Sequence, residues 1–221
     1  MSNLLNDDVI GQVQDAFQDL KEPVQILFFG DEDCEYCDDT HQLVKEVSDI
    51  SEMINLESLD LEKDPEKAQR FGVDKAPGLV IAGLDGEQVV DYGIRYAGIP
   101  SGHEFSSLIQ DLLLVSQREA GLSPETQEFL EGLQEPVHLQ VFVTPTCPYC
   151  PSAVILAHRF ALASEMVQAE MVESSEFQDL VLKYKVSGVP DTSINHGAGR
   201  VVGAVPEDDL VAEIQKALNS A

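Results

Sequence analysis

The chain has 221 residues, with 13 basic and 40 acidic side chains and a formal net charge of -27. This charge excludes nucleic acid and anionic membranes as partners bound by electrostatic attraction, and no run of 18 apolar residues is present to span a bilayer. A hydrophobic content of 43% is sufficient for packed cores, so we expect a folded protein.

The first residues of the chain and its low lysine content give expectations about the cellular compartment of the protein. Residues 1–8 contain neither the basic segment nor the long apolar stretch of a secretory signal, so we expect a cytoplasmic protein. Many proteins from thermophiles contain as many lysines as acidic residues, but this chain contains far fewer lysines than acidic residues. A salt-adapted cytoplasm and an ordinary acidic protein both explain this composition, and both alternatives stay open.

The first half of the chain predicts alternating strands and helices. Apolar density over 24–29 is typical of a buried strand, and alternation over 55–59 indicates another. The expected elements are, in order, an amphipathic helix over 6–20, a strand over 24–29, a helix from Cys34 toward Ser51, a strand over 55–59, a short helix capped by Asp64-Pro65, a strand over 79–82, a hairpin turn at Asp85-Gly86, a strand over 88–90 and a helix opened by Pro100.

The second half predicts the same elements in the same order. They are an amphipathic helix over 123–133, strands over 137–143, 167–172, 192–195 and 201–202, and helices that begin at Cys147, Ser174 and Pro206. A shift of 113 residues superimposes the two halves without a gap, placing Cys34 on Cys147 and Pro77 on Pro190. The chain is therefore predicted to hold two domains, 1–119 and 120–221, each an α/β unit with a mixed sheet flanked by helices.

Each half carries a Cys-x-x-Cys motif where a strand gives way to a helix. Unpaired N–H groups and the helix dipole stabilise a thiolate at a helix N-terminus, and a cysteine three residues later can close a disulfide. Such a pair attacks a disulfide and then releases the mixed disulfide by internal attack. We expect Cys34 and Cys147 to be the nucleophiles and Cys37 and Cys150 to be the resolving thiols.

Other uses of the cysteines fit the spacing less well. Zinc ribbons separate their two pairs by about 15–20 residues, far fewer than lie between Cys37 and Cys147. Permanent structural disulfides are uncommon in proteins without a secretion signal. The histidines share no metal-ligand spacing, so we expect no metal and no cofactor; they are His41, His103, His138, His158 and His196.

A proline follows each motif at a fixed distance. Ala76-Pro77 and Val189-Pro190 each place the proline 43 residues after the first cysteine and just before a strand. A cis peptide bond would suit such a tight strand entry, although a trans turn would be preferred for either proline alone. The same offset in both halves favours a functional role.

Together these features resemble the thioredoxin fold. Residues 147–150, CPYC, match the active-site tetrapeptide of glutaredoxins, and the tandem arrangement is similar to the glutaredoxin-like protein disulfide oxidoreductases of prokaryotes. Residues 142–151 and 96–105 both look like signatures of that family. The resemblance implies two tandem thioredoxin-like domains that perform dithiol–disulfide exchange on protein substrates, in reduction, oxidation or isomerisation. It also implies cis prolines, Pro77 and Pro190, that face the cysteines, with the backbone of Ala76 and Val189 pairing with the substrate. Pro148, Tyr36 and Tyr149 lie between the cysteines and are expected to contact substrate, although simple packing explains the two tyrosines equally well.

The sequence also departs from related families. Thr144-Pro145-Thr146 lacks the basic residue that often precedes the glutaredoxin cysteine, so glutathione binding is not expected. Thioredoxins have a buried acid six residues before the first cysteine, where this chain has Phe28 and Val141. Glu57 and Glu170 occupy equal positions in the second strand of each half; they are substitute proton acceptors or, as we favour, solvated strand residues.

The charge around the two motifs differs. Six acids and no base lie between Asp31 and Asp39, whereas residues 144–152 carry no charge. One carboxylate about 8 Å from a thiolate costs it about 0.5 kcal/mol in water-like dielectric, so several acids raise the pKa of Cys34 by about 1–2 units at low salt. We therefore expect Cys147 to be the faster nucleophile and the 147–150 pair to dominate.

Two alternatives to a protein disulfide oxidoreductase remain from the sequence. One is an electron carrier from a flavin-dependent, thioredoxin-reductase-like donor to a peroxidase such as a peroxiredoxin. It would resemble the tandem N-terminal part of alkyl hydroperoxide reductase flavoproteins, which usually keeps only the second Cys-x-x-Cys. The other is a chaperone module that binds unfolded peptides.

Overall fold

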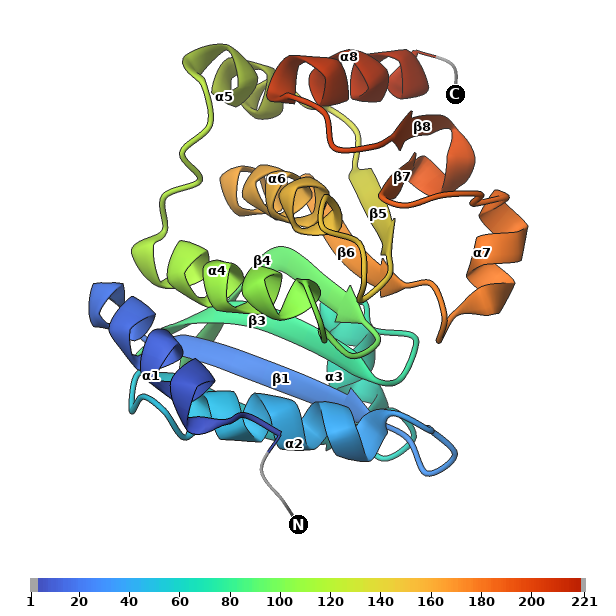
Figure 1. Cartoon of the computed structure of the whole chain (residues 1–221). Coiled ribbons are helices and arrows are strands. Elements are labelled where there is room, and N and C mark those ends of the chain that lie inside the picture. The colour runs from blue at the N-terminus through green and yellow to red at the C-terminus, as the bar shows by residue number, and fades with distance from the viewer. Residues whose placement is uncertain (1–3, 220–221) are drawn as a thin grey trace.

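The computed structural model describes residues 4–219, which form a central sheet with helices on both faces (Figure 1). The strands are β1 Val24–Gly30, β2 Ile54–Asp60, β3 Gly78–Asp85, β4 Gln88–Ala97, β5 Val137–Val143, β6 Val167–Glu173, β7 Asp191–Ile194 and β8 Gly199–Val202. The helices are α1 Asp7–Ala16, α2 Cys37–Ser48, α3 Pro65–Phe71, α4 Glu104–Gln117, α5 Pro124–Glu131, α6 Cys150–Ala163, α7 Gln178–Tyr184 and α8 Glu207–Leu218, with short 3-10 turns at Phe17–Asp19 and Asn195–Gly197.

The two halves share one sheet. Its strand order is β2-β1-β3-β4-β6-β5-β7-β8, in which β4 and β6 pair in parallel from Ile94–Ala97 to Ala169–Val172. We expected a separate mixed sheet in each unit, and the structure instead fuses two four-stranded sheets edge to edge. Gly93 permits the close approach, because a side-chain Cβ there would lie 2.5 Å from Val167 O.

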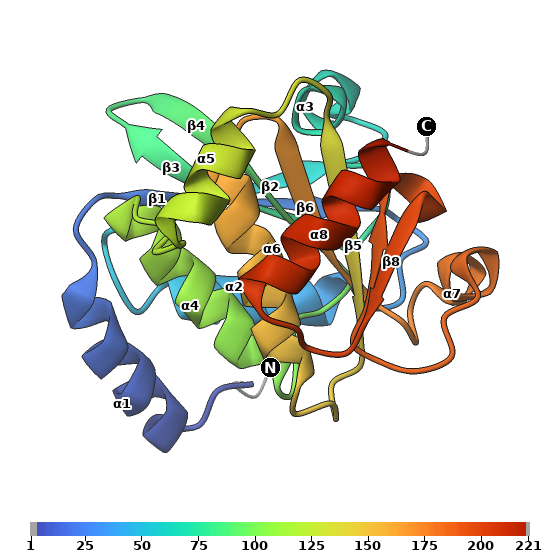
Figure 2. The same ribbon diagram turned by 90° about the horizontal axis from the view of Figure 1, so that it is seen from above.

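The helices form two layers on this sheet. The largest core cluster joins one face of the sheet to residues of α1, α2, α4, α5, α6 and α8, whereas α3 and α7 each cover a smaller cluster on the other face. Seen from above, α4 of the first unit and α6 of the second lie side by side at the centre (Figure 2). No helix within residues 4–219 is long and apolar enough to cross a bilayer.

Several helices begin later than the sequence predicts. The helices of the two motifs begin at Cys37 and Cys150 rather than at Cys34 and Cys147, because residues before them form turns in which Cys147 N donates to Thr144 O at 3.1 Å. Three further helices also begin later than predicted. The helices predicted to begin at Pro100, Ser174 and Pro206 begin instead at Glu104, Gln178 and Glu207, respectively. The last strand of the first unit is longer than expected, since β4 continues to Ala97.

The predicted turn and cap chemistry is confirmed in part. Gly86 has the left-handed φ of 61° that the hairpin requires, and the Ser123 hydroxyl caps α5 by accepting from Thr126 N at 3.2 Å. The Asp64 side chain does not cap α3; it accepts from Asp60 N at 3.0 Å. That carboxylate therefore stabilises the turn after β2.

Candidate active site

Both cysteine pairs close as disulfides at the ends of corresponding strands. The Cα atoms of Cys34 and Cys37 are 5.4 Å apart, and those of Cys147 and Cys150 are 5.5 Å apart. The second cysteine of each pair is buried at a helix N-terminus, with 8% exposure for Cys37 and 0% for Cys150. The first cysteine lies in the preceding turn, where the unpaired N–H groups of the helix still favour a thiolate.

The two prolines are cis, as predicted, in Ala76-Pro77 and Val189-Pro190. Their carbonyls make matching contacts, since Pro77 O accepts from Gly98 N at 2.9 Å and Pro190 O accepts from Gly203 N at 2.8 Å. Substrate pairing at these segments stays a prediction.

The residues between the cysteines are accessible in both motifs. Tyr149 is 70% exposed and Pro148 is also exposed, whereas Tyr36 is 37% exposed. The neighbouring Glu35 carboxylate raises the pKa of the Tyr36 phenol, with smaller contributions from burial and from Glu176. Tyr149 is thus the more exposed of the two tyrosines, but Cys147 is itself buried, with 7% exposure, whereas Cys34 is partly exposed. The second motif carries no charge of its own.

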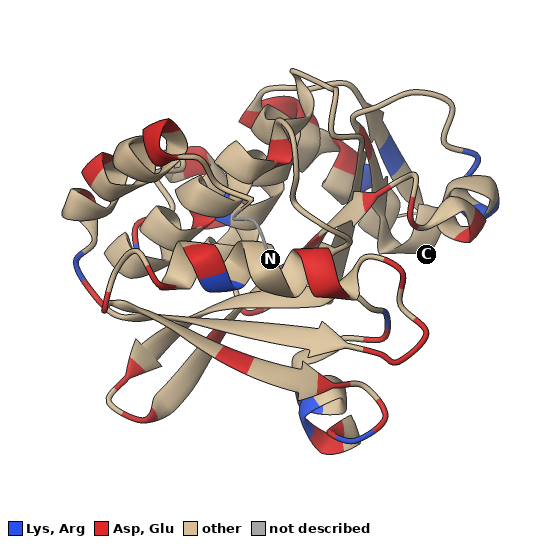
Figure 3. Cartoon of the chain, turned by 60° about the horizontal axis from the view of Figure 1, so that its bottom comes forward, with Lys and Arg blue, Asp and Glu red and all other residues tan. Residues whose placement is uncertain are grey.

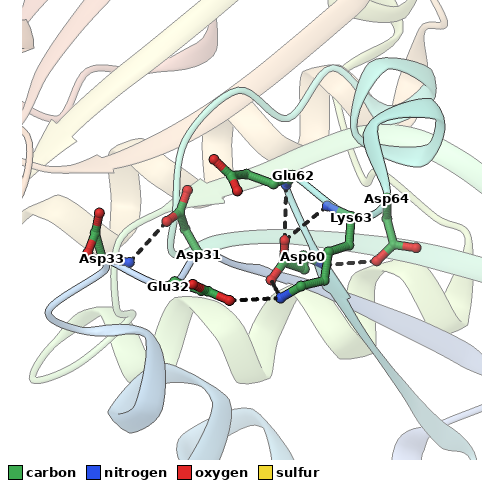
Figure 4. Close-up of polar contacts among 7 residues, drawn as sticks. All are labelled: Asp31, Glu32, Asp33, Asp60, Glu62, Lys63 and Asp64. Carbon is green, nitrogen blue, oxygen red and sulfur yellow. Dashed lines mark hydrogen bonds and ion pairs between the residues drawn. The ribbon is translucent and has the colours of Figure 1, made fainter.

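An acidic cluster lies beside the first motif (Figure 4), and one base offsets it. Lys63 Nζ donates to Glu32 at 3.3 Å and to Asp60 at 2.9 Å, so the prediction that no basic residue balances these acids is wrong. The hydrogen bonds from Lys63 also lower the pKa of Asp60. The turn after β2 brings further acids, Glu62 and Asp64, into the cluster, so the surroundings of the first motif remain strongly negative.

This cluster belongs to a surface that is acidic throughout. Asp and Glu occur on helices and loops across the molecule, and Lys and Arg occur in few places (Figure 3). The contrast between the two motifs is therefore local, because residues 144–152 form an uncharged segment within an acidic protein.

The first unit supplies part of the surroundings of the second motif. His103 N donates to Pro145 O at 2.9 Å, two residues before Cys147. The adjacent Gly102 has a φ of 60°, and a side-chain Cβ there would overlap Pro145 O. Glycine is thus required where the start of α4 meets this loop.

Glu104, the first residue of α4, is a candidate functional residue that no sequence motif singled out. It is 1% exposed and accepts from Ser107 Oγ at 2.6 Å, while its Oε1 has no hydrogen-bond partner among the described residues. Burial raises its pKa to about 7, an effect that nearby Asp111 reinforces and His158 opposes. Asp111 in turn bonds His158 Nδ1 at 2.5 Å and accepts from the Tyr96 hydroxyl, so a buried polar cluster joins the two units.

Sequence offered one signal for this cluster. Glu104 lies inside the 96–105 signature, but nothing in the sequence shows that it is buried near His158 of α6, which comes from the other unit.

Glu104→Gln should flatten the dependence of stability on pH. An acid whose pKa is raised on folding stabilises the fold while it is protonated, and this stability is lost as pH rises from about 4.5 through about 7. Between pH 5.5 and 8 the native chain should lose about 2 kcal/mol more unfolding free energy than the variant. Urea unfolding at both pH values measures this difference, and parallel losses in the two proteins would contradict it.

The two second-strand glutamates differ from each other. Glu57 is half exposed and pairs with Lys67, as a solvated strand residue would. Glu170 has a side chain only 8% exposed, so its predicted solvation is wrong; it accepts from Lys75 Nζ at 2.7 Å and from Gln140 Nε2 at 2.9 Å.

Neither glutamate is supported as a proton acceptor for the cysteines. Glu170 alternates along β6 with Ala169 and Met171. Those two residues pack in the same core cluster as Cys150, so the Glu170 side chain lies on the opposite face of the sheet. There it forms an ion pair between the units.

Comparisons with known proteins agree with this arrangement. Residues 137–216 match the thioredoxin domain family. A crystal structure of a protein disulfide oxidoreductase from Aeropyrum pernix superimposes with a TM-score of 0.85 and 31% identity, covering 95% of this chain and 92% of that one. A structure of the alkylhydroperoxide reductase component AhpF from Enterococcus faecalis superimposes with a TM-score of 0.86 and 28% identity, covering 95% of this chain and 99% of that one.

Full-length relatives are longer than this chain. The corresponding alkyl hydroperoxide reductase component of Pseudomonas putida is 26% identical over 203 residues, which cover 90% of this chain and 36% of that protein. The chain thus spans about a third of the length of the curated relatives it matches first.

Proposed function

The chain belongs to the glutaredoxin-like protein disulfide oxidoreductases of tandem thioredoxin fold, and we propose that it catalyses dithiol–disulfide exchange on protein substrates. The observation that carries the proposal is the closure of both Cys-x-x-Cys pairs at strand ends, each with its second cysteine buried at a helix N-terminus. Such a site holds a reactive thiol and its resolving partner in fixed positions.

In the reducing direction, the Cys147 thiolate attacks one sulfur of a substrate disulfide, the substrate S–S bond breaks, and one substrate thiolate leaves. The Cys150 thiolate then attacks Cys147 Sγ and expels the second substrate thiolate. The substrate gains two electrons and the enzyme is left with its 147–150 disulfide, which a thioredoxin-reductase-like donor would reduce again.

We assign the main activity to the second motif. Its uncharged loop supports this choice, since a protein substrate must approach the sulfur without being repelled by carboxylates. Acids on both flanks of the first motif disfavour its thiolates and stabilise its disulfide relative to the dithiol form.

A second function is supported by the relatives that are named as components of alkyl hydroperoxide reductase. In this alternative the chain carries electrons from a flavin-dependent reductase to a peroxidase such as a peroxiredoxin. The presence of two intact Cys-x-x-Cys motifs favours protein disulfide substrates over this narrower role.

The double variant Cys34→Ser/Cys147→Ser tests the proposed function. Without either nucleophile the chain should lose its thiol-dependent reduction of insulin disulfides, measured as the turbidity of precipitating B chains with dithiothreitol as donor. The matched control Ser48→Ala, at the end of α2 opposite to Cys37, should keep the native rate. A double variant as active as the native protein would refute the proposal. Efficient turnover of a peroxiredoxin with no reduction of insulin by the native chain would favour the electron carrier.

A further inference from the structure

A segment of the second unit completes the surroundings of the first motif. Glu176, in the turn between β6 and α7, accepts from Ile99 N through its Oε1 at 2.8 Å. The preceding Gly98 donates its N–H to the carbonyl of cis Pro77 at 2.9 Å. The Glu176 side chain of the second unit therefore holds the segment that follows β4. This segment contacts Pro77, which is predicted to bind substrate at the first motif.

The turn that carries Glu176 packs against the first unit at a position where only glycine leaves enough space. Gly98 has a φ of 97°, and a Cβ there would lie 2.6 Å from Glu173 Cβ and 2.9 Å from Glu176 Oε1. Glu173 is 3% exposed, and its Oε2 accepts from Glu176 N at 2.7 Å. The two carboxyl groups are therefore built into the junction between the units.

Acidic groups of both units act on Glu176. Its Oε2 is buried and has no hydrogen-bond partner in the described chain, and the same holds for Glu173 Oε1. Burial raises the pKa of Glu176 to about 7, with Glu173 and then Glu35 adding to the rise and the Ile99 N–H opposing it. Glu35 lies between the cysteines of the first motif, and the charges of Glu176 and Glu173 also raise the pKa of its neighbour Tyr36. No basic group is among the causes of either shift.

The second motif has no matching group at the same repeat position. The 113-residue shift places Glu176 on Lys63, which is bonded to Glu32 and Asp60 of its own unit. The end of β6 also borders the second motif, since Glu173 pairs with Val143, four residues before Cys147. The interactions of Glu176 itself are with Ile99, Glu35 and Tyr36 of the first unit, so its effect should be greater at the first motif.

We propose that Glu176 is a positioning residue of the first redox site: its carboxyl group fixes the Gly98–Ile99 strand end beside Pro77, and its charge sets the thiolate fraction of Cys34. This inference rests on the proposed function, because it concerns the reactivity of one of the two exchange sites. When Glu176 is protonated, the first site loses one of the negative charges around Glu35. When Glu176 ionises, that charge returns and the Cys34 thiolate becomes less favourable.

The isosteric variant Glu176→Gln separates the two roles. Glutamine keeps an oxygen that accepts from Ile99 N but removes the charge. The experiment uses the full chain carrying Cys147→Ser and Cys150→Ser, reduced, so that only the first pair reacts. The rate of Cys34 alkylation by iodoacetamide from pH 5 to 10 gives the pKa of the thiol. A carboxylate about 8 Å away shifts a pKa by about 0.4 units in water and by more when half-buried, so Glu176→Gln should lower the Cys34 pKa by about 0.5–1 unit.

Controls make the result specific. Glu176→Asp, which keeps the charge, should leave the Cys34 pKa near its native value. Glu165→Gln, at an exposed position of the second unit, should do the same. In the complementary background with Cys34→Ser and Cys37→Ser, Glu176→Gln should change the pKa of Cys147 less than it changes that of Cys34.

An unchanged Cys34 pKa in Glu176→Gln, or equal shifts at Cys34 and Cys147, would overturn the proposal. Urea unfolding of each variant verifies that the fold is intact, and Glu176→Gln is expected to fold because its backbone contact is retained. Alkylation reports thiol ionisation without any exchange substrate, so a failure of the proposed function in the insulin assay is distinguished from a failure of this inference.

Discussion

Cys147→Ser is expected to remove most of the disulfide-reductase activity of the chain, whereas Cys34→Ser should leave much of it. The physical cause is the difference in charge, because the acidic cluster of Figure 4 borders the first motif, whereas residues 144–152 carry no charge. A thiol pKa raised by about 1–2 units holds about 10–100-fold less thiolate at neutral pH. With insulin as substrate at low salt, Cys147→Ser should therefore reduce the rate at least about 10-fold, and Cys34→Ser less than about 2-fold.

Salt provides the control for this electrostatic cause. The screening length is about 10 Å at 0.1 M salt and about 3 Å at 1 M, so the residual activity of Cys147→Ser should rise relative to the native rate in 1 M NaCl. Equal losses in the two variants at low salt would contradict the assignment of the second motif as the main site. A difference that persists unchanged at 1 M salt would show that charge does not separate the motifs.

The cysteine pairs and the cis prolines could be predicted from the sequence of each unit because they are local features. A Cys-x-x-Cys after an apolar strand specifies a thiol at a helix start, and the cis bonds before Pro77 and Pro190 follow a motif that the repeat displays twice. Helix starts were predicted less accurately. The turn before Cys150 is closed by a backbone hydrogen bond, from Cys147 N to Thr144 O, and such a bond leaves no pattern in the sequence. In the turn before Cys37 the Asp31 side chain also takes part, accepting from Asp33 N at 3.0 Å.

The contacts between units could not be read in the same way. The pairing of β4 with β6 joins strands about 70 residues apart through backbone hydrogen bonds, which carry no pattern in the sequence beyond a glycine at the closest approach. Glu104 and Glu176 lie at this junction: Glu104 is buried near His158 of the second unit, and Glu176 accepts from Ile99 N of the first. From the sequence alone, both acids would be expected on the surface. Only the continuous sheet shows that they lie at the junction between the units.

Lys75→Met should destabilise the protein by about 3 kcal/mol, since it breaks the buried ion pair between the units. The Lys75 and Glu170 side chains are 17% and 8% exposed, and Nζ lies 2.7 Å from Glu170 Oε1. Removing the cation leaves a buried carboxylate with only the Gln140 amide as donor, and breaking a buried pair in this way typically costs about 3–5 kcal/mol. Partial access to water places this pair at the lower end of that range.

The repeat supplies a matched control for that measurement. Glu57 occupies the position of Glu170 in the first unit, but its pair with Lys67 is half exposed, with side chains 40% and 45% exposed. Lys67→Met should therefore cost less than about 1 kcal/mol in the same urea titration. Adding Glu170→Gln to Lys75→Met should recover part of the loss, because it removes the uncompensated charge. Equal losses from the two lysine variants would show that burial at the junction does not strengthen the Lys75–Glu170 pair. A larger loss from Lys75→Met would instead establish that the repeat position shared by Glu57 and Glu170 has two uses. It forms a surface ion pair in the first unit and an ion pair between the units in the second.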